Sequence, residues 1–293
     1  MIIKYCKLER GNFGDDLNDW LWPKLIPDLL IKENDNNFLI GIGTILGSDF
    51  NSLSGKKIVF SSGTGYKTGA KIDNTWDIIG VRGYKTAEIY NISAEKVLCD
   101  GAYLLRQVLD RSEFSHGNKI GFMPHNASID LFDWESVCKE LDMVYISPEA
   151  SVDFILEELK KCNKLITEAM HGAIVADALR IPWCAVSYSP RFLRFKWDDW
   201  VSVLEINLVI HQLPFVIKRG IDKKVIRKWK IKQFLGSLGL GKAKWKNFPK
   251  INDNNMNKNE LIEKLKSLKL SEKFQLSSDK TMVQIDQKLT LAL

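Results

Sequence analysis

Residues 166–182 read ITEAMHGAIVADALRIP and predict a switch from a buried strand to a helix. The apolar stretch ending at Thr167 is typical of a strand, and we expect the helix to open at His171 and stop at Arg180. It must stop before Pro182, because a residue that precedes proline is disfavoured in the helical conformation. A second apolar strand, residues 183–187, follows at once. This strand–helix–strand unit would place His171 in a first helical turn at the carboxyl edge of a parallel sheet, where α/β proteins bind anions.

The same alternation extends through both halves of the chain. Alternating strands and helices indicate a parallel sheet covered by helices. In the first half we expect strands over residues 2–7, 37–42, 57–60, 77–80 and 96–99, with helices over 16–26 and 86–90. In the second half we expect strands over 119–125, 143–147, 164–167 and 183–187, with helices over 134–141 and 151–160. The sequence therefore predicts an α/β fold of two Rossmann-like domains that face each other across a cleft.

The polar residues 110–118 suggest the boundary between the domains. We expect an N-terminal domain over 1–112, a C-terminal domain over 113–215, and a basic helical segment with a tail over 216–293. The pattern weakens after Gln212, and residues 270–293 are expected to pack loosely.

Composition narrows the class of protein. Of the 293 residues, 45% are hydrophobic and 27% charged, which is ordinary for a soluble globular chain. No apolar run approaches the roughly 18 residues that span a bilayer, and the N-terminus has no signal-peptide pattern. The five cysteines are scattered and form no CxxC pair, so we expect neither a disulfide framework nor a zinc site. A cytoplasmic location fits best.

Positive charge is concentrated in residues 218–250. This segment holds twelve Lys or Arg and one acid, whereas the whole chain carries a net charge of +6. It is either a solvated face or a surface for an anionic membrane or polyanion. No nucleic-acid module accompanies the charge, so we expect no nucleic-acid partner.

Polar residues gather where the predicted strands end. In the turn at residues 11–18, Asn12, Gly14, Asp15 and Asp16 precede a helix. Capping explains one of the two aspartates, and the other can contact a sugar hydroxyl or carry a proton. The glycines around Gly43 do not make a dinucleotide fingerprint, but they offer bare amides for a phosphate or a sugar.

Three further sets of polar residues follow predicted strands and could take part in the same site. Arg82 follows the strand at 77–80, and its fork suits a carboxylate or phosphate, although it could also pair with a surface acid. His125 and Glu168 end strands beside His171. Arg191 and Arg194 leave the next strand and could close the same edge.

In order, these motifs resemble the polysaccharide pyruvyl transferases. The resemblance covers residues 1–190 and rests on NFGDD at 12–16, the glycines at 41–47, Ser62-Gly63, Val81-Arg82, Cys99-Asp100, and the block from Met170-His171-Gly172 to Ile181-Pro182. The branch that decorates exopolysaccharides such as succinoglycan is the most similar. The resemblance implies a GT-B-like fold and transfer of a pyruvyl group from phosphoenolpyruvate to a sugar, forming a cyclic ketal. The first domain would then be the acceptor side and the second the donor side, with no metal or other cofactor.

The resemblance also assigns roles, with one departure. The family holds its donor with arginines and with the histidine of an Arg-Leu-His run. Here that run reads Ala169-Met170-His171, so the arginine is missing. A second cation would come from His125, Arg191, Arg194 or the helix dipole. Expected catalytic residues are His171 as acid, with Asp16 (or Asp15) and Glu168 as base; expected substrate-binding residues are Asn12, Gly14, Asp15, Gly43, Arg82, His125, Gly172 and Arg191.

Two other functions stay open. One is a GT-B-type glycosyltransferase that uses a sugar nucleotide, and the other is a carbohydrate-binding protein without catalysis. For the pyruvyl transferase, we expect phosphoenolpyruvate and an oligosaccharide or lipid-linked saccharide acceptor as partners. We also expect peripheral contact between residues 218–250 and the inner face of the cell membrane.

Overall fold

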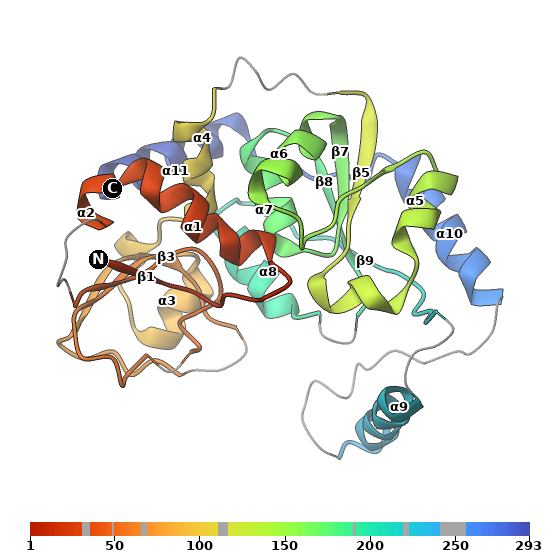
Figure 1. The fold of residues 1–293 in the computed structure, drawn as a ribbon, viewed down its shortest axis with the longest axis horizontal. Helices are drawn as coiled ribbons and strands as arrows, with labels where there is room; N and C mark the ends of the chain where they lie inside the picture. Colours follow the sequence, from red (N-terminus) through yellow and green to blue (C-terminus); the bar gives the residue numbers. More distant parts are fainter. Residues whose placement is uncertain are drawn as a thin grey trace.

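The computed structural model describes residues 1–30, 36–48, 50–65, 69–110, 117–189, 192–218, 223–240 and 256–293. Within these ranges the chain is an α/β protein with two parallel sheets, and helices pack against both (Figure 1). The predicted α/β class with parallel sheets is therefore confirmed. No helix in the described ranges is long and apolar enough to cross a membrane.

The first sheet comes from the N-terminal half. Its strands are β1 (Ile2–Lys4), β2 (Phe38–Ile40), β3 (Lys57–Ser62) and β4 (Trp76–Val81), hydrogen-bonded in that order and all parallel. All three residues of β2 are buried. A strand of this kind reads as a continuous apolar run because both faces of the sheet are covered.

The second sheet has the topology that creates a binding crevice. It contains β5 (Lys119–Met123), β6 (Val144–Tyr145), β7 (Cys162–Thr167), β8 (Trp183–Ser187) and β9 (Ile210–Gln212), all parallel, in the order β6-β5-β7-β8-β9. In relative numbers this is 2-1-3-4-5, the order of a doubly wound sheet. Its strand order reverses between β5 and β7, and ligands bind beyond the carboxyl ends of the strands at such a point.

Helices connect and cover the strands. Those of the first half are α1 (Phe13–Leu25), α2 (Pro27–Leu30), α3 (Tyr84–Tyr90) and α4 (Leu105–Val108), with short 3-10 turns η1 (Ala94–Lys96) and η2 (Gly101–Leu104). The second half adds η4 (Asn126–Leu131), α5 (Trp134–Glu140), α6 (Val152–Lys160), α7 (Met170–Ala178), α8 (Arg194–Val201), α9 (Lys223–Ser237), α10 (Met256–Lys269) and α11 (Asp279–Ala292). Serine side chains cap two of them: Ser151 accepts from the Phe154 N–H, and Ser278 accepts from the Thr281 N–H.

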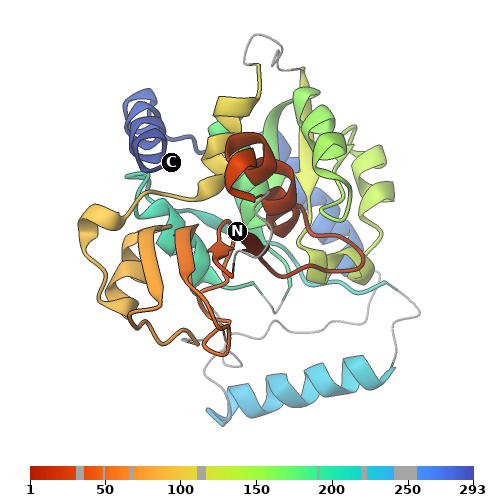
Figure 2. The same ribbon diagram turned by 60° about the vertical axis from the view of Figure 1, so that its left-hand side comes forward.

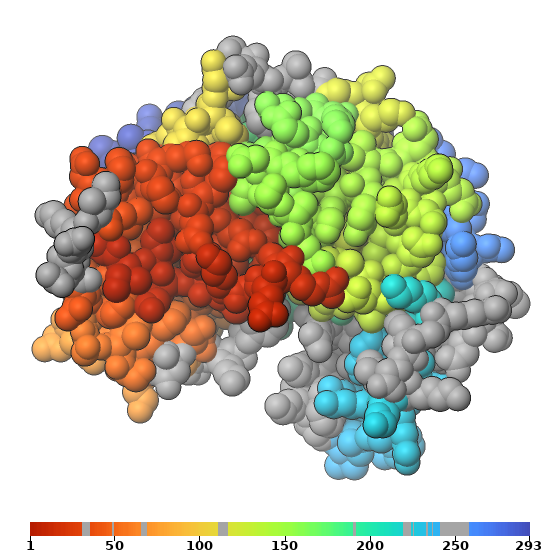
Figure 3. Space-filling view, viewed as in Figure 1, coloured from red at the N-terminus to blue at the C-terminus, as the bar shows by residue number. Residues whose placement is uncertain are grey.

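The largest cluster of buried side chains, the shared core, spans both halves; it includes Leu17 and Phe60 from the first half and Leu165 and Trp183 from the second. Each half also has a smaller buried cluster of its own. Helices bridge the halves: α1 packs against α6 and α7, α8 packs against α3, and α7 and α11 pack against η2. In the space-filling view the two halves touch along a seam (Figure 3).

Three expectations about elements need correction. Residues 96–99 do not form a strand; the turn η1 ends at Lys96, and Val97 makes only an isolated bridge to Val81. Helix α1 begins at Phe13, three residues earlier than expected. Helix α7 ends at Ala178 rather than at Arg180, which takes a left-handed conformation with φ of 64°.

The C-terminal region is also more ordered than expected. Residues 279–292 form helix α11, which buries Met282, Ile285 and Leu289. This helix packs against η2 of the first half, and the Asp286 carboxylate lies 2.9 Å from Arg106. The expectation of a loosely packed tail is therefore wrong.

Candidate functional site

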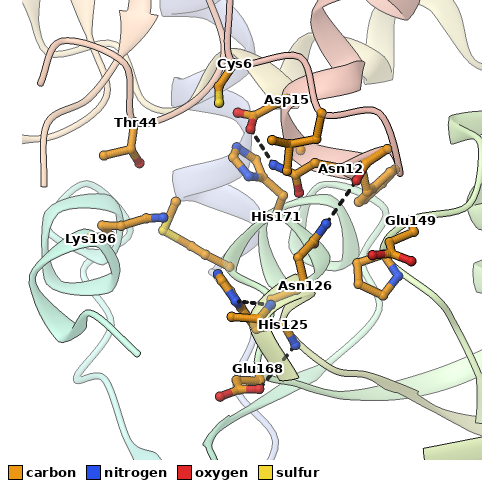
Figure 4. A pocket seen from close by; sticks show the side chains of 18 of the residues that line it. Cys6, Asn12, Asp15, Thr44, His125, Asn126, Glu149, Glu168, His171 and Lys196 are labelled. Atoms are coloured by element: carbon orange, nitrogen blue, oxygen red, sulfur yellow. Dashed lines mark hydrogen bonds between the residues drawn. The ribbon is translucent and has the colours of Figure 1, made fainter. Parts of the chain in front are cut away.

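The cavity that collects the expected site residues has a volume of about 690 Å³ (Figure 4). It lies beyond the carboxyl ends of β5 and β7, where the order of the second sheet reverses. Both halves of the chain line it. Asn12, Gly14 and Asp15 come from the turn into α1, His125 follows β5, Glu168–His171 follow β7, and Lys196 comes from α8.

His171 is the second residue of α7, close to that helix's N-terminus. Its ring packs against Gly14, where a Cβ atom would overlap the imidazole. Its Nε2 atom lies 3.7 Å from Oδ2 of the buried Asp100, and neither atom has a hydrogen-bond partner in the described structure. Since 3.7 Å is too long for a hydrogen bond, the two groups face each other without a bond.

The Asp100 carboxylate keeps its charge. Burial by itself would raise its pKa, but His171, the positive charge of Arg82 and the Ala102 N–H together outweigh this, so the pKa is lowered. Asp100 caps η2 with one carboxylate oxygen and places the other against His171.

The two aspartates of the α1 turn do different things. The Asp16 carboxylate accepts a 2.7 Å hydrogen bond from the Asn12 backbone N–H, which is a capping interaction, and Asp16 is not among the cavity-lining residues. Asp15 lines the cavity and accepts a hydrogen bond from the Asn12 side chain. The structure thus brings Asp15, rather than the expected Asp16, toward His171. Gly43 lies behind Asp15, with a φ of 120° that favours glycine.

The surroundings of Asp15 increase the affinity of its carboxylate for a proton. Burial raises the pKa of its carboxyl group, and this effect exceeds the opposing influence of His171, the Asn12 hydrogen bond and Lys196. A carboxylate with a raised pKa is a better general base than an exposed one.

Glu168 connects, through hydrogen bonds, the loops that follow β5 and β8 beside the cavity. Its Oε1 atom accepts hydrogen bonds from the N–H groups of Tyr188 (3.0 Å) and Ser189 (2.6 Å), and its Oε2 accepts one from His125 N–H (3.2 Å). Burial raises its pKa, against the effect of these bonds. Glu168 lines the cavity as expected, but its oxygens are occupied by the backbone of two loops. This geometry suits a positioning residue better than a base.

His125 also has a defined ring orientation. Its Nδ1 atom accepts a 3.1 Å hydrogen bond from the Ala127 N–H, so the neutral ring carries its proton on Nε2. Gly172 has a packing role: a Cβ there would meet the Met123 sulfur at 2.7 Å, so the glycine lets α7 lie close to β5.

Arg82 is not where we expected it. Its side chain is fully buried, its guanidinium pairs with Asp199 at 2.8 Å, and it donates to Thr44 (2.9 Å) and to the Thr64 carbonyl (3.1 Å). Thr44 lines the cavity, whereas Arg82 lies behind it. The expectation that Arg82 reaches across a cleft to an anion is therefore not met, because a buried arginine pairs with the nearest carboxylate. Arg191 lies outside the described residues.

Lys196 is the residue that sequence reasoning missed. It lines the cavity from α8, to one side of the loops that follow β5 and β7 (Figure 4). Burial, together with the positive charge of Arg82, lowers its pKa to about 8, although Asp15 and Asp100 oppose the shift. The only signal for Lys196 in the sequence is its place in the run of basic residues after β8, which also contains Arg191 and Arg194.

Comparison with known proteins assigns the chain to a family. Residues 11–190 match the family model of polysaccharide pyruvyl transferase, and this span includes every site residue above except Lys196, Asp199 and Arg191. The chain belongs to the polysaccharide pyruvyl transferase family. It is also 34% identical over 230 residues to the succinoglycan biosynthesis protein ExoV of Rhizobium meliloti (strain 1021), which covers 77% of this chain and 72% of the relative. No solved structure matches the chain.

Membership in the pyruvyl transferase family agrees with the position of the cavity. The family match includes both the α1 turn and the His171 helix, which are about 150 residues apart in sequence and meet in the fold. The resemblance inferred from the ordered motifs is confirmed.

Proposed function

We propose that this protein transfers the pyruvyl group of phosphoenolpyruvate to a sugar of a bacterial surface polysaccharide, forming a pyruvate ketal and releasing phosphate. The observation that carries the proposal is the meeting of His171 and Asp15 in one cavity at the mouth of α7, in a chain of the pyruvyl transferase family. Its similarity to a succinoglycan biosynthesis protein makes succinoglycan-like exopolysaccharides the first acceptors to test.

The proposed reaction needs one acid and one base. Protonation of the methylene carbon of phosphoenolpyruvate makes a methyl group and an oxocarbenium-like centre. One sugar hydroxyl attacks this centre, phosphate leaves, and a second hydroxyl attacks to close the ketal. Of the two hydroxyl protons, one balances the new methyl C–H and the other leaves with phosphate. His171 supplies the acid, and Asp15 accepts the hydroxyl protons.

The position of His171 suits this role. The N–H groups of the first turn of α7 face an anionic donor favourably, and the Asp100 carboxylate lies behind Nε2 of the ring, 3.7 Å away. For the acceptor, we propose that the sugar enters from the α1 side, as in a GT-B-like cleft between the two halves.

A phosphate-release assay tests the proposal. Purified protein is incubated with phosphoenolpyruvate and exopolysaccharide fragments, and the glycan is analysed for the mass of an added ketal. We expect phosphate release that depends on the acceptor and is lost in His171→Ala. His211→Ala is the matched control, because His211 lies in β9, outside the cavity lining. Release of nucleoside diphosphate from a sugar nucleotide instead would favour a glycosyltransferase, and glycan binding without turnover would favour a binding protein.

We also propose that α9 contacts an anionic membrane surface. The helix carries six Lys or Arg residues and no acid. Ile231, Phe234 and Leu238 are 50%, 63% and 56% exposed, and their spacing of three and four residues places them in one stripe. Trp229, on the opposite side of the helix, packs against Phe215 with ring centroids 5.8 Å apart. Figure 2 shows α9 apart from the two sheets. An apolar stripe flanked by cations is typical of helices that lie in the membrane interface.

Vesicle co-sedimentation tests the membrane contact. We expect binding to vesicles that contain phosphatidylglycerol, loss of binding in high salt, and little binding to neutral vesicles. Phe234→Asp should weaken binding, whereas Val283→Asp, an exposed apolar site on α11, should not. Equal binding to neutral and anionic vesicles would contradict the proposal.

A further inference from the structure

The proposed donor carries more negative charge than the expected residues can balance. Phosphoenolpyruvate has a phosphate and a carboxylate, and enclosing both needs cationic partners. Ala169, just before the first turn of α7, lines the cavity with an uncharged methyl group. The histidines and the α7 dipole supply part of the charge, so another cation is required.

Among the residues that the structure describes, the arginines near the cavity pair with carboxylates. Arg82 is buried against Asp199. Arg10 lines the cavity, but it is neutralised by Asp130 at 2.6 Å and Glu149 at 2.9 Å. On α8, the Arg194 side chain is 62% exposed and lies 3.3 Å from Asp198.

Lys196 is held in place by the rest of α8. Trp197 and Trp200 of this helix are buried in the shared core. Asp199 binds Arg82 and also accepts hydrogen bonds from the Thr86 backbone and side chain, each 2.8 Å long. The aliphatic part of Lys196 passes against Gly65, where a Cβ would meet the lysine Cγ at 2.8 Å. The helix that neutralises Arg82 therefore presents Lys196 to the cavity.

We propose that Lys196 binds the anionic end of phosphoenolpyruvate. This inference rests on the proposed function. The ammonium group comes from the α8 wall, whereas His171 and the first turn of α7 come from another wall, so the donor would lie between them with its charges divided between two sides of the cavity.

The lowered pKa of Lys196 predicts a pH dependence of donor binding that an arginine would not give. Its pKa of about 8 leaves it mostly protonated at neutral pH and mostly neutral above pH 9. A bound anion favours the protonated form and raises the pKa further. Donor affinity is thus complete below about pH 8 and is lost as the pH rises through the pKa of the complex.

The test compares three variants of the full chain. Binding of phosphoenolpyruvate is measured by titration calorimetry, and KM and kcat are measured by phosphate release. We expect Lys196→Met to raise the dissociation constant and KM about 10- to 100-fold, as for a lost charge-assisted hydrogen bond, with a smaller effect on kcat. Lys196→Arg should keep the affinity and hold it above pH 8, because the guanidinium does not titrate there. Arg194→Met, on the exposed side of the same helix, should match the wild type.

The outcomes separate the two proposals. If the wild type neither binds nor turns over phosphoenolpyruvate, the proposed function is wrong, and the role of Lys196 falls with it. If the wild type does both and Lys196→Met binds the donor equally well, only the role of Lys196 is wrong. A loss of affinity above pH 8 that persists unchanged in Lys196→Arg would also overturn it. Thermal unfolding of each variant identifies any that fail to fold.

Discussion

At the scale of single residues, the cavity depends on an absent side chain at Gly14. Its φ is not in the left-handed region, so the glycine is needed for space rather than for backbone conformation. A Cβ atom at this position would overlap the ring of His171. We expect Gly14→Ala to displace the imidazole, to lower turnover at least 10-fold, and to destabilise the fold by about 1–3 kcal/mol through overpacking.

A double variant tests that explanation. If the clash with His171 causes the loss of stability, Gly14→Ala should cost much less in a His171→Ala background. Urea unfolding of the wild type, both single variants and the double variant gives the coupling energy. Additive losses would show that the alanine disturbs something other than His171.

Arg82 and Asp199 form a pair whose two members depend on each other. Both side chains are fully buried. We expect Arg82→Ala to lower the free energy of unfolding by about 3–5 kcal/mol, because it leaves a buried carboxylate without its partner. Arg82→Met with Asp199→Leu should recover much of that loss, as measured by urea denaturation. A double variant no more stable than Arg82→Ala would point to the hydrogen bonds to Thr44 and Thr64 instead.

Sequence reasoning found the half of the site that follows strands. His125, Glu168 and His171 all come directly after β5 or β7, and the carboxyl ends of parallel strands meet at one edge. The buried ion pair of Arg82 could not be predicted from the sequence, because the partner Asp199 is 117 residues away. Lys196 was missed for the same reason: which side of α8 faces the cavity is decided by Trp197 and Trp200, whose burial depends on the tertiary fold.

At the scale of elements, helix α11 contributes to stability through one face. Ile285 is 2% exposed, whereas Val283 on the same helix is 54% exposed. We expect Ile285→Ala to cost about 2–5 kcal/mol of unfolding free energy. Val283→Ala, the matched control, should stay within about 0.5 kcal/mol. Similar losses in both would mean that helix propensity, rather than packing, determines the effect.

The elements were predicted well where the local pattern decides them. Strands β2, β3, β5, β7 and β8 and helices α5 and α6 lie within a few residues of their expected bounds. Helix α11 shows why the rest was harder. Its buried Met282, Ile285 and Leu289 have helical spacing, but the helix packs against η2, which lies far earlier in the chain.

At the scale of the whole molecule, the shared core predicts cooperative unfolding. The largest hydrophobic cluster runs from α1 and β3 to β7 and β8, so unfolding of either half exposes side chains that the other half covers, although each half also has a smaller cluster of its own. We expect calorimetry to show one transition in which the van't Hoff and calorimetric enthalpies agree. Two resolved transitions would indicate instead that residues 1–112 and 113–215 behave as separate domains.

The contact between α11 and η2 also has a consequence for synthesis on the ribosome. Arg106 and Asp286 meet in the folded protein, but they emerge 180 residues apart from the exit tunnel. The part of η2 that α11 covers in the folded protein therefore stays exposed on the nascent chain until α11 is translated. Chaperones that shield exposed hydrophobic surface would have their longest opportunity to bind this chain during that interval.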